Sequence, residues 1–338
     1  MSARIPFFAI SLMLLGSPAL REAAAPPSSS AGQLIVVNQK EHTLLVVDPD
    51  ARRELAKISV GVNGHEVILS KDSRYAYVPI YGNSGVGRPG TDGSTIDVID
   101  LQARKLTTTI DLGKPLRPHC AKMGPDGLLY VTAELDNAIS VIDPSAGKVL
   151  GEIPTGEPQS HMLVLSADGH RGYTANVSAG TVSVLDVAQR KLITTIPVSK
   201  SVQRISISPD GKRVYTHDQS APRIAVIDVA TNKVSNWIEL PDVAYASAAT
   251  PDGKWLISIS MSGNHLHVID TQSWKVVRSL DIPQGSSEIL IRPGGQTAYV
   301  SGTGAGKIAV VDLKNWTVEA PIEMTPGVDG LAWASASN

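Results

Sequence analysis

A run of β-forming residues that ends in aspartate recurs seven times, and this repeat constrains the fold more than any other feature of the chain. The final residues of the seven runs are Asp48, Asp100, Asp143, Asp186, Asp228, Asp270 and Asp312. Successive aspartates are 52, 43, 43, 42, 42 and 42 residues apart. A period of this length in β-branched sequence predicts a propeller built from four-stranded blades.

Each repeat has the same internal plan, and the two ends of the chain complement each other. Turns such as SPDGK separate a first strand from a second, and the aspartate run supplies the third. The segment QLIVVN at 33–38 matches a second strand, and VDGLAW at 328–333 matches a first strand. We therefore predict an all-β, seven-bladed propeller over 33–334, closed by pairing the C-terminal strand with the N-terminal three, and a tail at 335–338.

The first 25 residues resemble a secretory signal peptide. A single Arg4 precedes an apolar run that ends in small residues, with cleavage predicted after Ala19 or within Ala23–Ala25. The run is too short and too interrupted by proline for a membrane span. Residues 26–32, PPSSSAG, then form a flexible leader. The sequence predicts an exported protein, periplasmic or secreted, without membrane insertion.

Composition excludes several function classes. The formal net charge is −2 and charged residues are 18% of the chain. This composition lacks the excess of positive charge that is typical of nucleic-acid-binding proteins. The single cysteine, Cys120, rules out an intramolecular disulfide. We expect a monomer.

Short motifs that follow the turns identify a family resemblance. AYVPI, LYVTAE, GYTANV and VYTHD each lie between a PDG-like turn and an aspartate run. In these motifs the chain resembles the YVTN family of β-propeller repeats over nearly all of its predicted mature length. The resemblance implies the propeller fold. It implies no single activity, because that family includes surface-layer proteins, binding scaffolds, electron-transfer relatives and enzymes.

The repeat also predicts which residues surround the central channel. Counting seven residues back from the turn position of each repeat, and one further period for the closing strand, gives His65, His119, His161, Gln203, Tyr245, Ser287 and Asp329. The next position in each repeat is occupied by Glu66, Cys120, Met162, Arg204, Ala246, Glu288 and Gly330. Both sets should gather at one end of the channel, the top face.

Three histidines on consecutive blades predict a metal site. Neutral imidazoles at His65, His119 and His161 are the ligand type that Zn, Fe, Cu or Ni prefers, so we expect one divalent transition metal there. Three protein ligands leave open positions for water or substrate. The alternative is that the histidines only form hydrogen bonds between blades and that no cofactor is bound. The other four blades lack histidine at this position, and this asymmetry favours the metal.

Polar residues on the same face complete the predicted site. Glu66 or Glu288 is expected to move protons, and Arg117 or Arg204 to hold an anionic group. The long loop at 81–95 should overhang His65 as a lid. Six further residues are predicted to contact the ligand: Tyr81, Arg88, Arg117, His217, Tyr245 and Asp329.

These features predict an exported propeller whose top-face axial pocket binds a small polar ligand. If the protein is an enzyme, metal-assisted chemistry of the lactonase, lyase or hydrolase type is expected, by analogy with other propellers. The alternative is a non-catalytic binding or scaffold propeller that presents this face to a protein, a glycan or a metal ion.

Overall fold

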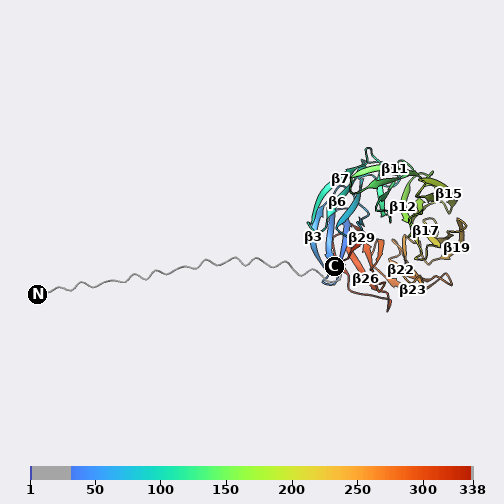
Figure 1. The fold of residues 1–338 in the computed structure, drawn as a ribbon. Coiled ribbons are helices and arrows are strands. Elements are labelled where there is room, and N and C mark those ends of the chain that lie inside the picture. Colours follow the sequence, from blue (N-terminus) through green and yellow to red (C-terminus); the bar gives the residue numbers. More distant parts are fainter. Residues whose placement is uncertain (2–31, 336–338) are drawn as a thin grey trace.

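The protein is a seven-bladed β-propeller, as the repeat predicts. The computed structural model describes residue 1 and residues 32–335. The predicted signal peptide, apart from residue 1, and nearly all of the leader and tail lie outside the described residues. Seven antiparallel sheets stand around a central axis (Figure 1). Among the described residues, no helix has the length and hydropathy needed to cross a bilayer.

The first four blades each consist of four strands that follow one another from the axis outward. Blade 1 contains β29 (Val328–Ala334), β1 (Gln33–Asn38), β2 (Thr43–Asp48) and β3 (Arg53–Ser59). Blade 2 contains β4 (Ile68–Leu69), β5 (Tyr75–Gly82), β6 (Asp92–Asp100) and β7 (Lys105–Asp111). Blade 3 contains β8 (Pro118–Met123), β9 (Leu129–Ala133), β10 (Ala138–Asp143) and β11 (Lys148–Pro154). Blade 4 contains β12 (Ser160–Leu165), β13 (Arg171–Asn176), β14 (Thr181–Asp186) and β15 (Lys191–Pro197).

The remaining three blades follow the same order. Blade 5 contains β16 (Val202–Ile207), β17 (Arg213–Asp218), β18 (Arg223–Asp228) and β19 (Lys233–Glu239). Blade 6 contains β20 (Ala246–Ala249), β21 (Trp255–Ile259), β22 (His265–Asp270) and β23 (Lys275–Asp281). Blade 7 contains β24 (Ser286–Ile291), β25 (Thr297–Gly302), β26 (Lys307–Asp312) and a divided outer strand, β27 (Thr317–Val318) and β28 (Ile322–Glu323).

The C-terminal strand closes the ring. β29 pairs with β1 in antiparallel register, with Leu34 opposite Trp333 and Val36 opposite Leu331. In Figure 1 the red C-terminal strand accordingly lies beside the blue N-terminal strands. This pairing removes the exposed edge that blade 1 would otherwise present, which confirms the predicted closure.

Alternating residues of a strand pack against the two neighbouring blades. On β1, Ile35 and Val37 pack with Val78 of blade 2, whereas Leu34 and Val36 pack with Tyr299 of blade 7. Successive side chains on a strand point to opposite faces, so the second and third strands of a blade, such as β1 and β2, are buried and apolar at most positions. The outer strands are largely exposed, as in β7. Each blade therefore depends on its neighbours for its core.

The repeated aspartates are structural. Asp48 Oδ1 accepts hydrogen bonds from the backbone N–H groups of Asp50 and Ala51, at 3.1 and 2.9 Å. The aspartates of the other six repeats accept backbone N–H bonds in the same turn. This arrangement caps the hairpin between the third and fourth strands of every blade. The seven carboxylates are thus turn acceptors and not catalytic acids.

Candidate functional site

The seven equivalent positions predicted from the repeat do meet around the axis. His65 Nδ1 donates a hydrogen bond to Asp329 Oδ2 at 2.8 Å, and Ser287 Oγ donates to Asp329 Oδ1 at 2.7 Å. On the other side, the Gln203 amide lies 3.4 Å from both His161 Nε2 and the Tyr245 hydroxyl. We call the end of the channel where these residues gather the axial site.

β-Bulges explain why two consecutive positions of some repeats reach this site. The pairing of the inner strand with its neighbour shifts by one residue near Cys120, His161, Arg204 and Ser287, and again near Asp329. A regular strand would point consecutive side chains to opposite faces, but a bulge changes the direction of one of them. Arg204 and Glu288 of the second set named from the sequence therefore reach the axial site beside Gln203 and Ser287, whereas Cys120 and Met162 point into the hydrophobic core.

The three histidines form a row across adjacent blades. The ring centroids of His65 and His119 are 5.0 Å apart, and those of His119 and His161 are 3.7 Å apart. His119 is 3% exposed, and its Nδ1 is buried with no hydrogen-bond partner. Burial, together with the charges of His161 and His65, holds the pKa of His119 well below its usual value. His119 is therefore a neutral imidazole at neutral pH, which is the form that binds metals.

Carboxylates orient the two outer histidines of the row. His65 donates its Nδ1 proton to Asp329, and His161 donates its Nδ1 proton to Glu134 Oε1. Glu134 Oε2 also accepts a 2.7 Å hydrogen bond from the hydroxyl of Tyr81. Such bonds fix the tautomer and leave Nε2 of each ring as the basic nitrogen. Glu134 thus has a role that the sequence analysis did not assign to it.

A buried arginine neutralises the carboxylates of the axial site. Arg204 Nη1 lies 2.7 Å from Glu66 Oε1 and also forms an ion pair with Glu288, while Nη2 lies 3.9 Å from Asp329 Oδ1. Burial by itself would lower the pKa of Arg204. The negative charges of Glu66 and Glu288 have the larger effect and keep this pKa well above its usual value. The guanidinium also lies over the ring of Tyr245, 5.2 Å from its centroid.

Glu288 is the one carboxylate of this cluster that titrates near neutrality. Burial and the charge of Glu66 raise its pKa to about 7, although Arg204 acts in the opposite direction. Its side chain is 22% exposed, so protons can reach it from solvent. A carboxyl group that changes protonation near pH 7 is suited to general acid–base chemistry.

Glu288→Gln should therefore change how stability depends on pH. Between pH 4.5 and 7 folded wild type holds a proton that the unfolded chain releases, so wild-type stability falls as pH rises through this window. The variant lacks this proton, and its stability relative to wild type should rise by up to about 1.4 kcal/mol per pH unit. Urea unfolding of both proteins at pH 5 and pH 7.5 measures this. A difference that does not vary with pH would contradict the assignment.

The loop of blade 2 is fixed by Arg117. The loop proper spans 83–91, because β5 and β6 extend through both ends of the predicted insertion. Arg117 donates from Nε to Asp92 at 2.6 Å and from its two terminal nitrogens to the carbonyls of Gly85 and Arg88, at 3.1 and 2.9 Å. The guanidinium is thus used to hold the loop, and the structure gives Arg117 a positioning role. Arg88 is itself exposed on the loop.

His217 and Cys120 lie behind the axial site. His217 is fully buried, and its Nδ1 donates to the Arg204 carbonyl at 3.2 Å while Nε2 has no partner. Burial lowers the pKa of His217 to about 4. Cys120 is fully buried, with its Sγ 3.6 Å from the Leu163 carbonyl oxygen. Both residues support the inner strands from within the core.

A second histidine cluster lies away from the axis, on blade 6. Among residues 32–335, one group of three metal-ligating side chains has all its ligand atoms within 4.8 Å of one another, namely Asp242, His265 and His267. The three axial histidines do not reach this separation as they stand. The sequence analysis did not identify this group. The signal that could have revealed it was the alternation of His265 and His267, which share one face of a strand.

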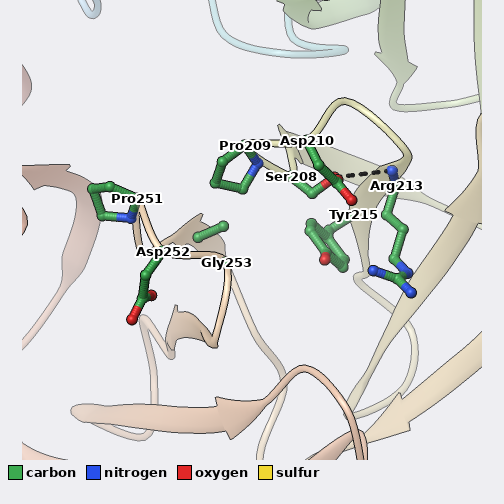
Figure 2. A pocket seen from close by; sticks show the side chains of 9 residues that line it. Ser208, Pro209, Asp210, Arg213, Tyr215, Pro251, Asp252 and Gly253 are labelled. Atoms are coloured by element: carbon green, nitrogen blue, oxygen red, sulfur yellow. Dashed lines mark hydrogen bonds between the residues drawn. The ribbon is translucent and has the colours of Figure 1, made fainter.

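The opposite face of the propeller carries hollows lined by turns. Figure 2 shows one of about 410 Å³ between the turn that follows β16 and the turn that follows β20. Ser208, Asp210 and Asp252 line it, and Ser208 Oγ accepts a 3.0 Å hydrogen bond from the Arg213 N–H. Asp210 and Asp252 in turn accept bonds from the hydroxyls of Ser208 and Thr250. These polar groups are committed to the turns.

Comparison with known proteins supports the architecture. No protein-family model matches the chain. Its sequence is 29% identical over 138 residues to the seven-bladed beta-propeller protein Rv1057 of Mycobacterium tuberculosis, covering 40% of this chain and 32% of that protein. The match therefore spans about a third of the length of that curated relative. It agrees with the fold and establishes no activity.

Solved structures agree over most of the chain. Kuenenia stuttgartiensis hydrazine synthase superposes with a TM-score of 0.71 at 18% identity, covering 89% of this chain and 99% of that one. A protein of unknown function from Desulfotomaculum acetoxidans gives 0.75 at 15% identity, covering 90% and 99%. Dihydro-heme d1 dehydrogenase NirN in complex with DHE gives 0.66 at 14% identity, covering 93% and 77%. At these identities the likeness is one of fold alone.

Proposed function

We propose that this protein is an exported, monomeric binding propeller whose axial site holds a divalent transition metal on His65, His119 and His161. The metal in turn would bind a small polar ligand at the mouth of the channel. The observation that carries this proposal is the state of the histidine row: the two outer rings are held at Nδ1 by buried carboxylates, and the middle ring is buried, neutral and unpartnered.

A purely structural role explains this arrangement poorly. A buried polar nitrogen without a partner costs about 1–3 kcal/mol, and it is rare in folded proteins. His119 Nδ1 and Arg204 Nε both carry this cost in the same site. A bound ion and its ligand would satisfy such groups. Because the three rings do not place their nitrogens within 4.8 Å of one another, metal binding requires at least one ring to move.

The residues around the row suit a small polar ligand. Gln203 and the Tyr245 hydroxyl offer hydrogen bonds from the same ring of residues, while Arg204 is committed to its carboxylates. Gln203 contacts His161 Nε2 at the long distance of 3.4 Å, which a stronger ligand can replace. Tyr81, near the end of β5, forms a wall of the site, because its ring contacts both His65 and His119 edge-on.

One observation favours catalysis over simple binding. Glu288 is partly exposed and has a pKa of about 7, so it can give or take a proton at neutral pH. Together with a metal that polarises a carbonyl, this would support hydrolase, lyase or lactonase chemistry. Glu66 is a weaker candidate for this role, because its ion pair with Arg204 is less exposed to solvent than that of Glu288.

Metal analysis of purified protein tests the proposal. Wild type should bind one transition metal per axial site, and His119→Ala should lose it while its circular dichroism spectrum stays that of wild type. His170→Ala is the matched control, because His170 is an exposed histidine on a turn. Measuring metal content in an Asp242→Asn background removes any contribution from the blade 6 cluster.

Two results would overturn the axial metal site. One is wild-type protein that neither carries nor binds Zn²⁺, Cu²⁺ or Ni²⁺ in calorimetric titrations. The other is a folded His119→Ala variant that binds metal with wild-type stoichiometry and affinity in the Asp242→Asn background. Either outcome leaves the alternative, a propeller that binds its partner without a metal.

A further inference from the structure

The histidine cluster on blade 6 joins two parts of the chain. Asp242 lies in the link between β19 and β20, whereas His265 and His267 begin β22. Asp242 Oδ2 lies 2.8 Å from His265 Nδ1, and Oδ1 lies 3.0 Å from His267 Nε2. One carboxylate therefore faces two imidazoles across the gap between the link and the blade.

The spacing of these atoms matches a coordination shell. With bonds of about 2.0–2.1 Å, neighbouring ligand atoms around tetrahedral Zn²⁺ are about 3.3 Å apart. Nitrogen–oxygen distances of 2.8 and 3.0 Å are close to this value, so small side-chain adjustments suffice. Two imidazoles and one carboxylate also form a donor set that Zn²⁺ accepts readily.

The surroundings hold the cluster in place yet leave it accessible. The His267 side chain is 1% exposed and its Nδ1 is 2.8 Å from Ser279 Oγ, whereas the His265 side chain is 42% exposed. A Cβ atom at Gly263 would collide with the Asp242 carboxylate. The backbone can therefore approach this carboxylate closely only because residue 263 is glycine. Asp281 Oδ1 lies 3.8 Å from His265 Nε2, the ring nitrogen that does not face Asp242.

We propose that Asp242, His265 and His267 form a zinc site with an open fourth position for water. On binding, each neutral imidazole keeps its single proton, which moves from the nitrogen that now donates to Asp242 to the other ring nitrogen, so no net proton is released. His267 Nδ1 then donates to Ser279, because a serine hydroxyl can accept as well as donate. The ion fastens the link between blades 5 and 6 to β22. This site is separate from the axial site and does not depend on it.

Calorimetric titration with ZnCl₂ tests the proposal on the whole protein. In a His119→Ala background one zinc should still bind. Asp242→Asn, which preserves shape but removes the charge, and His267→Ala should each weaken that binding about 100-fold or more. His170→Ala should leave it unchanged. Folded Asp242→Asn and His267→Ala variants that bind zinc as tightly as their parent would overturn the site.

Anomalous scattering keeps the test decisive if a variant does not fold. Wild-type crystals soaked in ZnCl₂ and measured at the zinc absorption edge should show a peak about 2.0–2.2 Å from His267 Nε2 and an Asp242 oxygen. A peak there supports the site. Saturating zinc with no peak among these three residues overturns it, whatever is found at the axial histidines.

Discussion

Replacing Arg204 with methionine is expected to lower the free energy of unfolding by about 3–5 kcal/mol. The guanidinium faces Glu66, Glu288 and Asp329, all of which contribute to one buried site. Removing the cation leaves carboxylates buried without their counter-charge, which costs far more than the pair itself contributes. Urea unfolding at pH 7.5 measures the loss, and the loss should shrink at pH 5, where the carboxylates more readily take up protons.

Arg171→Met is the matched control for this change. Arg171 forms one ion pair, to Asp186 at 3.1 Å, and its side chain is 43% exposed. Exposed pairs contribute about 0–1 kcal/mol, so this variant should stay close to wild type. Equal losses in the two variants would mean that the axial cluster is as well solvated as the surface, and the argument for a buried, charged site would fail.

Gly330→Ala is expected to destabilise the protein by about 3 kcal/mol, the upper end of the cost of overpacking. A Cβ at Gly330 would collide with the His65 carbonyl oxygen and lie 2.8 Å from Glu66 Cα. These are backbone atoms, which cannot move aside as a flexible side chain can. Gly330 also donates its N–H to the His65 carbonyl at 2.8 Å, so this contact joins the closing strand to blade 2.

Gly172→Ala provides the comparison for Gly330→Ala. Gly172 also lies within a strand, β13, but a Cβ there would meet its nearest atom at 3.5 Å, an ordinary contact. This variant should remain within about 1 kcal/mol of wild type in urea unfolding. Because Gly330 also sets the position of His65, the alanine variant should weaken axial metal binding. A Gly330→Ala protein as stable as Gly172→Ala would contradict the proposed approach of β29 to blade 2.

Sequence reasoning placed the axial site well because the repeat is regular. A residue's position within a 42-residue unit determines its height on the inner strand, and closure of the ring then determines its neighbours. His65, His119 and His161 could thus be predicted to be adjacent. Asp329 could be predicted to lie beside His65, although the two residues are near opposite ends of the chain. Their contacts in the structure bear out that placement, while the metal and the roles of these residues stay predictions.

Sequence reasoning failed where side chains had to be paired. Arg117 and Arg204 were equal candidates to hold an anion, yet one is used to fix a loop and the other neutralises a carboxylate cluster. His217 was expected to contact the ligand, but it is fully buried and donates to a backbone carbonyl. No repeat period predicts these outcomes, because they depend on loop conformation and on which donors lie within about 3 Å.

The sequence by itself determined the architecture. Seven runs that end in aspartate recur at a near-constant period, which requires seven blades. A second strand at one end of the repeats and a first strand at the other require a closed ring. Only the tertiary structure decided how that ring is used. The bulge near Arg204 turns the consecutive residues Gln203 and Arg204 to one site, and the link carrying Asp242 meets His265 and His267 across a blade. Strand periodicity is a local property, whereas these contacts join distant segments through irregular backbone.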